Sequence, residues 1–349
     1  MHPKVYIIIL NWNGLEDTLE CLESVFELSY PKFEVLVVDN GSTDDSVAVI
    51  RKAYRGVILI ENKENLGYTG GNNIGMRYAL NNGADYVWLL NNDTVVEIDT
   101  LSKLVDRGES SPEIGLISPI IYYYDEPHKI QSLGSYVDWK SFEFFTIKSR
   151  EQLSNEIVRK DMFLWGTALL IKRSVIDSVG YLSEKYFAYQ EDAEYSIRAA
   201  KSGYRNVIEN RARVYHKNSR STGSQTSLIQ VFLRVRNSYF FWMGNLKGFR
   251  KLSYFWKFMA DTISRAAALK NENFVESVEA CFNGAWAGFL GIGGSWDKNI
   301  IMPSLLKKIF HVLCSWHPYF WASLLRGEFR SITSEVLKRT KYKILRVTN

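Results

Sequence analysis

The stretch WLLNNDTVV, from Trp88 to Val96, joins the end of an apolar run directly to two amides and a carboxylate. The apolar residues at its start are typical of a buried strand. A buried cluster of polar groups is costly unless its members find hydrogen-bonding or charged partners. Asn91, Asn92 and Asp93 therefore predict that a partner from outside this stretch meets the end of the strand.

Four apolar runs alternate with stretches of helical periodicity in the first hundred residues. The first helical stretch carries Leu15, Leu19, Leu22 and Phe26 at intervals of three or four residues. Continuously apolar strands are buried on both faces, as in a parallel sheet that helices cover. This alternation predicts an open α/β fold of the doubly wound type. The predicted strands are KVYIIIL, FEVLVVD, GVILIEN and DYVWLL, and two further helices are predicted over about residues 44–54 and 71–82.

Polar residues follow each of these four strands. The first is followed by NWNG, the second by DNGSTD, the third by ENLGYTGGNN and the fourth by NNDT. The carboxyl ends of parallel strands meet at one edge of a sheet, where ligands of open α/β folds bind. The four strands therefore predict a single ligand site built from amides, glycines and acids.

The rest of the chain has two kinds of pattern. Over residues 119–160 the alternation of apolar strand runs and helical stretches stops, which predicts an extended loop region. After it we expect a strand, a helix from Arg173 and a helix starting near Glu191. From about Thr226 the pattern is helical throughout. We therefore predict a catalytic α/β domain over residues 1–225 and a helical C-terminal region over residues 226–349.

Charge is concentrated at the end of the chain. The 349 residues carry a net charge of +5, whereas residues 300–349 hold nine basic and two acidic residues and many aromatic ones. The uncharged run over residues 309–325 is interrupted by polar residues and a proline, so it favours an interfacial segment over a membrane span. We expect this tail to bind an anionic membrane surface. It matches no nucleic-acid-binding fingerprint.

The chain is expected in the cytoplasm, at the inner face of the cell membrane. Its three cysteines, Cys21, Cys281 and Cys314, are far apart and form no paired framework, which is typical of a reducing compartment. The N-terminus has no cleavage region of a signal peptide.

The predicted nucleotide-binding residues have structural alternatives. Asp39 is placed to bind the base or ribose of a nucleotide, but it is also placed to cap the following helix. The glycines at positions 67, 70 and 71 would let a nucleotide approach the backbone closely, but glycines also serve turns that bind nothing. Neither residue type decides the function alone.

The candidate metal-ligating and catalytic residues are three acids and one histidine. Asp93 at a strand tip suits Mg²⁺ or Mn²⁺ bridging two phosphates, and His216 is either a second ligand or a structural histidine. Glu191 and Asp192 begin a helix, where the macrodipole favours carboxylates. A carboxylate beside a metal-bound diphosphate would also serve as the base for an incoming hydroxyl.

Six blocks of the chain resemble the family-2 glycosyltransferases, in the order which that family shows and over about residues 4–220. The motifs NWNG, after the first predicted strand, and NNDT, after the fourth, are most similar to those of its rhamnosyltransferase-like and galactofuranosyltransferase-like branch. The blocks are VYIIILNWNGLEDTLECLESV, VLVVDNGSTDDSV, NLGYTGGNNIGMRYAL, WLLNNDTVV, WGTALLIKRSVIDSVGYL and FAYQEDAEYSIRAAKSGYR.

The resemblance implies a GT-A fold, a mainly parallel Rossmann-like sheet flanked by helices, and inverting transfer from a sugar nucleotide with a divalent cation, Mg²⁺ or Mn²⁺. Carried over by position, Asp192 is the general base and Glu191 supports it. The metal motif reads Asn91-Asn92-Asp93 where the family usually has two aspartates, which predicts weaker metal affinity. The remaining implied roles are base binding by Asp39, ribose binding by Asn91, diphosphate and metal binding by Asp93, metal binding by His216, further donor contacts by Asn11, Asn13, Gly67, Gly71 and Asn92, and acceptor binding by Trp165 and Gly166.

The sequence thus predicts a glycosyltransferase that moves a sugar from dTDP-rhamnose or a UDP-sugar to a hydroxyl of a glycan or lipid-linked saccharide, in polysaccharide biosynthesis of the cell envelope. The alternative is a catalytically silent sugar-nucleotide-binding module, against which the retention of Asp93, Asp192 and His216 argues. An oxidoreductase would require GxGxxG after the first strand, where NWNG stands.

Overall fold

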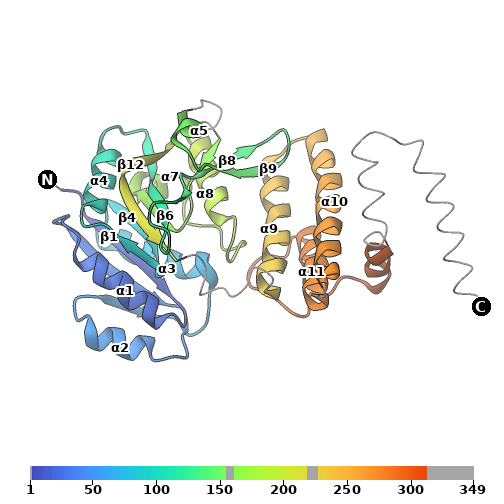
Figure 1. The fold of residues 1–349 in the computed structure, drawn as a ribbon, viewed down its shortest axis with the longest axis horizontal. Helices are drawn as coiled ribbons and strands as arrows, with labels where there is room; N and C mark the ends of the chain where they lie inside the picture. Colours follow the sequence, from blue (N-terminus) through green and yellow to red (C-terminus); the bar gives the residue numbers. More distant parts are fainter. Residues whose placement is uncertain (1, 155–160, 218–226, 273, 313–349) are drawn as a thin grey trace, which may run out of the picture. The chain divides into compact units, whose positions relative to one another are not determined.

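The computed structural model of the protein describes residues 2–154, 161–217, 227–272 and 274–312. The chain divides into two units (Figure 1): residues 1–224 with 293–295 form the first, and residues 225–292 with those from 296 onward form the second. The prediction of a membrane-binding tail falls largely on residues 313–349, which lie outside the described residues.

The first unit alternates strands and helices through its N-terminal half, as the apolar runs predict. Its elements are β1 (Val5–Asn11), α1 (Leu15–Phe26), β2 (Phe33–Asp39), α2 (Ser46–Ala53), β3 (Ile58–Glu61), α3 (Gly67–Asn81), β4 (Tyr86–Asn91), β5 (Thr94–Val96), α4 (Thr100–Glu109), β6 (Ile114–Tyr123), β7 (Ile130–Ser132), β8 (Ser135–Asp138), β9 (Glu143–Thr146), α5 (Arg150–Ser154), β10 (Met162–Phe163), β11 (Ala168–Lys172), α7 (Arg173–Val179), α8 (Glu191–Lys201) and β12 (Arg205–His216).

The main sheet is mixed in direction. Its strand order is β3-β2-β1-β4-β11-β6-β12-β5, with β7 paired to β6. The first four strands are parallel, as predicted, but β11 runs antiparallel to both β4 and β6. Because β6 is antiparallel to β11 in turn, β6 and its parallel neighbour β12 run in the same direction as β1 to β4. The expectation of a mainly parallel sheet is therefore confirmed, and β11, β5 and β7 are the strands that run in the opposite direction. Because β11 is also buried on both faces, its apolar sequence ALLIK carries no signal of direction.

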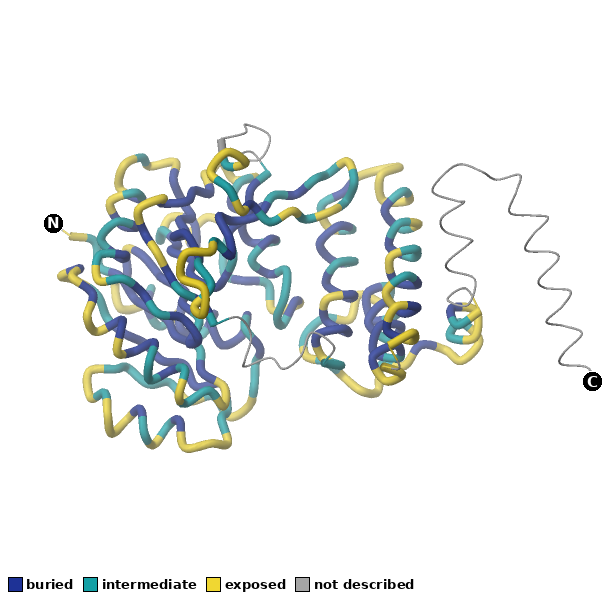
Figure 2. Tube along the Cα trace, viewed as in Figure 1, coloured by how far each residue is buried: buried dark blue, intermediate teal, exposed yellow. Residues whose placement is uncertain are grey.

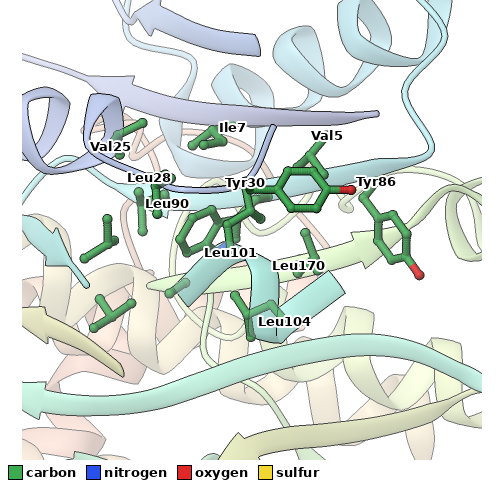
Figure 3. Packing of buried hydrophobic residues seen from close by; sticks show 14 of the residues in the cluster. Val5, Ile7, Val25, Leu28, Tyr30, Tyr86, Leu90, Leu101, Leu104 and Leu170 are labelled. Carbon is green, nitrogen blue, oxygen red and sulfur yellow. The ribbon is translucent and has the colours of Figure 1, made fainter. Parts of the chain in front are cut away.

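Apolar side chains fill both faces of the sheet. Along β1, Val5, Ile7 and Ile9 pack with α1 and α4 on one face, whereas Tyr6 and Ile8 pack with α3, α7 and α8 on the other. Figure 3 shows the first of these clusters. Alternate residues of a strand point to opposite faces, so a strand covered on both sides must be apolar throughout. The polar edge left at the strand ends is therefore the natural place for a site.

The prediction of an extended loop over residues 119–160 was wrong. Strand β6 continues to Tyr123, and β8 pairs with both β9 and β10 in a separate three-stranded sheet. Strands β8, β9 and β10 have four residues or fewer. Such short strands give too few alternations for a periodic signal.

The second unit is helical. Its elements are α9 (Leu228–Asn245), α10 (Phe249–Asn271), α11 (Val275–Leu290) and a helical segment over residues 304–312. Ser227 caps α9 by accepting a hydrogen bond from the backbone N–H of Gln230. Figure 2 colours the buried and exposed sides of these helices. Within the described ranges, no helix combines the length and the apolar character that a membrane crossing requires.

Candidate active site

The carboxyl ends of three neighbouring strands bring polar residues to one edge of the main sheet. In the parallel register, Asn11 of β1 lies opposite Asp39 of β2, and Leu10 lies opposite Asn91 of β4. Residues that are 28 and 80 positions apart from Asn11 in sequence therefore become close neighbours. This edge is the one that the sequence predicts for the ligand.

Asp39 is held by its neighbours in a buried position. Its Oδ1 accepts hydrogen bonds from Asn11 Nδ2 at 2.8 Å and from Ser42 Oγ at 2.6 Å, and its Oδ2 accepts from the Ser42 N–H at 2.9 Å. Helix α2 begins only at Ser46, with Asp45 at its N-cap position, so Asp39 does not cap it. Asp39 instead shapes the turn after β2, and Oδ2 retains room for another donor.

Asn11 and Asn13 stabilise this turn. The Asn11 side chain is fully buried, and its Oδ1 accepts a hydrogen bond from Thr18 Oγ1 at 2.8 Å. Asn13 has a φ of 51° and its Oδ1 accepts from the backbone N–H of Thr43 at 2.7 Å. The Asn11 amide thus binds Asp39 directly, and the Asn13 side chain binds the backbone of the turn that follows Asp39.

The two asparagines of the NND motif also have protein partners. Asn92 Nδ2 donates to Thr18 Oγ1 at 3.0 Å, so its buried side chain points toward α1. The Asn91 carbonyl accepts from Thr94 Oγ1 at 2.6 Å and from Cys21 Sγ at 3.6 Å. Burial raises the pKa of the Cys21 thiol to about 12, which keeps it protonated as a donor. These contacts fix the turn that presents Asp93.

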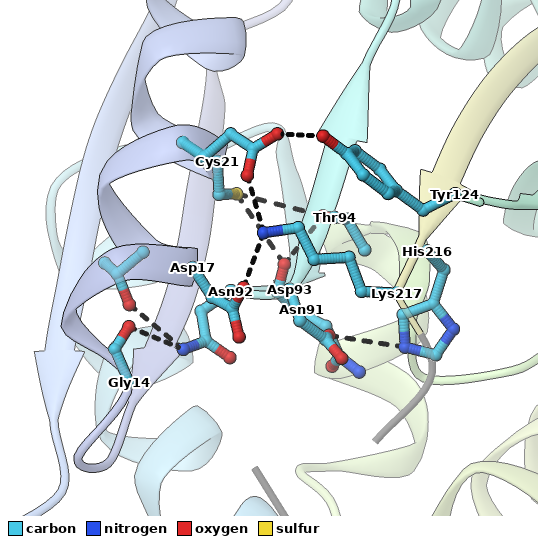
Figure 4. A network of polar contacts seen from close by, with 12 residues as sticks. Gly14, Asp17, Cys21, Asn91, Asn92, Asp93, Thr94, Tyr124, His216 and Lys217 are labelled. Atoms are coloured by element: carbon cyan, nitrogen blue, oxygen red, sulfur yellow. Dashed lines mark hydrogen bonds and ion pairs between the residues drawn. The ribbon is translucent and has the colours of Figure 1, made fainter. Parts of the chain in front are cut away.

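Asp93 and His216 meet at the edge of the sheet. His216 ends β12 opposite Thr94 of β5, and its Nε2 lies 3.3 Å from Asp93 Oδ1. The other ring nitrogen, Nδ1, lies 2.9 Å from Oε1 of Gln131, a residue of β7. Both side chains of the pair are more than nine-tenths buried. Figure 4 shows Asp93 beside His216. The imidazole of His216 thus contacts a carboxylate on one side and the amide of Gln131 on the other.

The contact with Gln131 places a hydrogen on Nδ1 of His216. An amide oxygen can only accept, so Nδ1 donates to Gln131, and Nε2 is the ring atom directed at Asp93. Two lone pairs at this distance repel unless a proton or a cation lies between them. Gln131 was missed by the sequence reasoning because it lies in the stretch that was expected to be loop.

This pair fits a divalent cation whose coordination a substrate completes. Two ligand atoms in adjacent positions of an octahedron, each about 2.1 Å from Mg²⁺, lie about 3 Å apart, which is close to the separation of Asp93 Oδ1 and His216 Nε2. No group of three or more potential metal-ligating side chains occurs among the described residues.

A salt-bridge cluster holds the residue after His216. Lys217 Nζ lies 2.5 Å from both Asp17 Oδ1 and Glu20 Oε2 of α1, and only 9% of its side chain is exposed. The Tyr124 hydroxyl donates to Glu20 Oε1 at 2.5 Å, and Lys217 lies 5.3 Å from the centre of the Tyr124 ring. This charge cluster ties the end of β12 to α1 and fixes the position of His216 (Figure 4).

Asp192 connects to the same edge through a chain of hydrogen bonds. The Asn91 N–H donates to the Thr167 carbonyl at 2.9 Å, and the neighbouring Gly166 N–H donates to Asp192 Oδ2 at 3.2 Å. A Cβ at Gly166 would lie 2.6 Å from the Tyr68 hydroxyl, so the close contact requires glycine. Asp192 therefore lies near the end of β4 although it is a hundred residues further along the chain.

Trp165 is anchored on the small sheet. Its Nε1 donates to Ser135 Oγ at 2.8 Å, and the ring is partly exposed. An indole whose N–H is bonded to the protein keeps a fixed ring face. This arrangement leaves Trp165 available to contact a sugar ring next to Gly166.

Glu191 is buried beside Asp192 at the start of α8. Burial, followed by the charge of Asp192, raises the pKa of Glu191 well above its ordinary value. Burial, followed by the charges of Glu191 and Asp192, raises the pKa of Tyr68, whose hydroxyl donates to the Gly166 carbonyl at 2.6 Å. Glu191 therefore keeps its proton to a higher pH than an ordinary glutamate does.

The loop before this acid pair has an unusual backbone. Phe187, Tyr189 and Gln190 have φ values of 63°, 71° and 67°, which cost about 1 kcal/mol or more each in residues other than glycine. The Thr69 N–H donates to the Phe187 carbonyl at 3.0 Å and helps to hold this shape. Strain that surrounding contacts maintain is common at functional sites.

Helix α3 explains the glycines of NLGYTGGNN differently from the sequence prediction. The helix begins at Gly67, about four residues earlier than expected, so Gly70 and Gly71 lie inside it. A Cβ at Gly67 would lie 2.5 Å from the Phe187 carbonyl oxygen, and one at Gly71 would lie 2.3 Å from the Leu10 side chain. The close approaches that these glycines allow in the structure are to the protein itself.

Comparisons with known proteins agree with this architecture. The model of Glycosyl transferase family 2 matches residues 6–180. The N-acetylglucosaminyl-diphospho-decaprenol L-rhamnosyltransferase of Mycobacterium tuberculosis is 29% identical over 211 residues, which cover 54% of this chain and 68% of that protein. The low-salt glycan biosynthesis hexosyltransferase Agl10 of Haloferax volcanii is 26% identical over 251 residues, which cover 68% of this chain and 75% of that protein.

Solved structures share the fold at low sequence identity. S. aureus TarS 1-349 in complex with UDP-GlcNAc has a TM-score of 0.59 at 16% identity, covering 93% of this chain and 92% of that one. The mannosyltransferase PcManGT from Pyrobaculum calidifontis, in complex with GDP-Man and Mn²⁺, has a TM-score of 0.52 at 16% identity, and the match covers 94% of this chain and 85% of that one. The fold is thus GT-A, with a mixed central sheet flanked by helices and a helical C-terminal region. The family match over half of the chain, together with the rhamnosyltransferase and hexosyltransferase relatives, shows that this protein belongs to glycosyl transferase family 2 and is a glycosyltransferase that acts on nucleotide sugars.

Proposed function

We propose that the protein is an inverting, metal-dependent glycosyltransferase whose donor is dTDP-rhamnose or a UDP-sugar. One observation carries the proposal: Asp93 Oδ1 and His216 Nε2 are buried 3.3 Å apart, with Nδ1 of the histidine engaged by Gln131. That pair is complementary to a cation, which would neutralise negative charge on the departing diphosphate. Mg²⁺ or Mn²⁺ suits the oxygen-rich remainder of such a site.

The donor would lie along the carboxyl ends of β1, β2 and β4. Asp39 would accept a hydrogen bond from the base through Oδ2, the oxygen that keeps a free lone-pair position, and Asn91 would contact the ribose. Asp93 and His216 would hold the cation beside the diphosphate. Asn92, whose amide donates to Thr18, would act by holding this turn in place.

Asp192 would be the general base. Its carboxylate would take the proton of the acceptor hydroxyl as that oxygen forms a bond to the anomeric carbon and the bond to the diphosphate breaks. Attack from the face opposite the leaving group inverts the anomeric configuration. Glu191, whose pKa burial raises, would hold the acceptor or orient Asp192.

The acceptor would be a glycan or a lipid-linked saccharide at the inner face of the cell membrane. The name of the Mycobacterium tuberculosis relative specifies a diphospho-decaprenol substrate and a rhamnosyl transfer. Trp165, with its ring fixed by Ser135, would pack against the apolar face of the acceptor sugar next to Gly166. Such a reaction fits polysaccharide biosynthesis of the cell envelope.

The variant Asp192→Asn tests this assignment. It preserves the shape of the side chain and removes the base, so transfer of labelled sugar should fall by a factor of about 100 or more while calorimetric binding of the donor with Mn²⁺ stays within a few-fold of wild type. Asp177→Asn, on the exposed side of α7, is the matched control and should change neither. Wild-type turnover in Asp192→Asn would refute the assigned base, and a wild-type protein that binds donors without transferring them to any acceptor would favour the silent module.

A further inference from the structure

Three large apolar side chains are exposed on the first two turns of α10. The exposed fractions are 78% for Phe249, 49% for Leu252 and 62% for Trp256. Their spacing of three and four residues places them on one face of the helix. We call Phe249, Leu252 and Trp256 the α10 stripe.

The α10 stripe is distinct from the face that packs in the second unit. The buried positions of the same helical stretch are Tyr254 and Phe258, and the Tyr254 hydroxyl lies 3.0 Å from Ser238 Oγ of α9. Single exposed apolar residues are ordinary on protein surfaces, but a contiguous group indicates a binding surface. The stripe therefore adds nothing to folding of the helical unit and needs another explanation.

Basic residues surround the start of the stripe. Lys247, Arg250 and Lys251 are exposed, and the first turn of α10 has no acidic residue. The positive end of the helix dipole lies at the N-terminus and disfavours cations there. Both the exposed apolar residues and the misplaced charges are thus locally unfavourable in water, and both become favourable at an anionic apolar interface.

We propose that the α10 stripe and its basic residues bind the surface of an anionic lipid bilayer. Aromatic and aliphatic side chains would enter the boundary between head groups and acyl chains, where tryptophan is favoured. Lysine and arginine would meet the head groups, each raising partitioning roughly fivefold. The helix would lie in the plane of the membrane rather than cross it.

Other occupants of this surface fit less well. Residues 313–349 of this chain hold seven basic and two acidic residues, so their charge repels Lys247, Arg250 and Lys251. A second copy of the chain that covered the stripe symmetrically would bring the same basic residues together. An anionic surface is complementary in both charge and polarity. The proposal does not depend on the donor, the acceptor or the cation of the reaction.

Vesicle sedimentation tests the proposal with the full-length protein. The vesicles contain phosphatidylcholine alone or with about 30% phosphatidylglycerol. Wild type should pellet with the anionic vesicles, and high salt should weaken this binding. The double variant Phe249→Ser/Trp256→Ser should lower the partition coefficient about tenfold or more, and Arg250→Gln/Lys251→Gln should lower it and reduce its salt dependence.

Val275→Ser is the matched control. Val275 is 68% exposed at the start of α11, but its neighbours include Glu272 and Glu276 rather than basic residues. It should bind vesicles like wild type, and all variants should keep the wild-type denaturation midpoint and donor affinity. Equal vesicle binding by wild type and the Phe249/Trp256 double variant would overturn the proposal. A dimer in solution that this double variant abolishes would also overturn it, because a second copy would then cover the stripe.

Discussion

The side chain of Asn73 offers a test of how the acid pair is positioned. Asn73 lies in α3, is 1% exposed, and binds both backbone groups of Leu182. Its Oδ1 accepts from the Leu182 N–H at 3.0 Å, and its Nδ2 donates to the Leu182 carbonyl at 2.9 Å and to Glu184 Oε1 at 2.9 Å. Leu182 begins the loop that leads to Glu191 and Asp192, so Asn73 attaches this loop to the helix.

The substitution Asn73→Ala leaves a buried N–H and a buried carbonyl of Leu182 without their partner. Each such group costs about 1–3 kcal/mol, while alanine regains roughly 0.5 kcal/mol of helix propensity. We therefore expect the free energy of unfolding to fall by about 1.5–5.5 kcal/mol. Because the loop carries the proposed base and Asn73 touches no part of the predicted donor site, kcat should fall more than donor affinity.

Asn72→Ala is the matched control. Asn72 is equally buried, but its side chain donates only to the Tyr68 carbonyl one turn earlier in the same helix. Its loss should cost less than about 1 kcal/mol. Urea denaturation measures both variants, and single-turnover assays report kcat. Equal denaturation midpoints for the two variants, or a fall in donor affinity as large as the fall in kcat, would refute the proposed role of Asn73.

Three further predictions concern the same site. Gln131→Leu removes the acceptor of the His216 Nδ1 hydrogen bond and should weaken Mn²⁺ binding by a factor of about 10 or more; unchanged affinity in calorimetry would contradict it. Glu191→Gln removes a carboxyl whose pKa burial raises well above its ordinary value in the folded state, whereas the unfolded glutamate ionises above about pH 4.3. The stability of wild type should therefore fall relative to the variant as the pH rises from about 5 to 7, and parallel melting temperatures would contradict this. Gly67→Ala places a Cβ 2.5 Å from a backbone oxygen, whereas Gly83→Ala has a similar positive φ and open space. Gly67→Ala should lower the free energy of unfolding by about 2 kcal/mol more than Gly83→Ala does in chemical denaturation. Equal losses would show that the loop around Phe187 moves to accommodate the Cβ.

The strands whose ends carry the site residues could be predicted from the sequence, because each is marked by a pattern within its own few residues. Both faces of β1 and β4 are covered, so each strand is a continuous apolar run that ends in polar residues. Parallel neighbours must end at the same edge, which brings Asp39 and Asn91 together without further information. The structure also brings Asp93 and His216 together, although the chemical roles of these residues stay predictions.

Other features depend on contacts that no local pattern encodes. Gln131 lies on a three-residue strand, and only the three-dimensional structure shows its contact with His216. The direction of β11 was missed because an antiparallel strand buried on both faces has the same composition as a parallel one. The first turn of α3 was missed because glycines disfavour helices, and the packing of Gly67 against Phe187 and of Gly71 against Leu10 becomes visible only in the fold.

The nitrogen coupling of bound Mn²⁺ reports directly whether His216 is a metal ligand. In pulsed electron paramagnetic resonance of the protein with Mn²⁺ and UDP or dTDP, we expect coupling to both a histidine nitrogen and the phosphorus of the diphosphate. The nitrogen coupling should disappear in His216→Ala. Bound Mn²⁺ that shows no nitrogen coupling in wild type, or a coupling that His216→Ala leaves unchanged, would contradict the account.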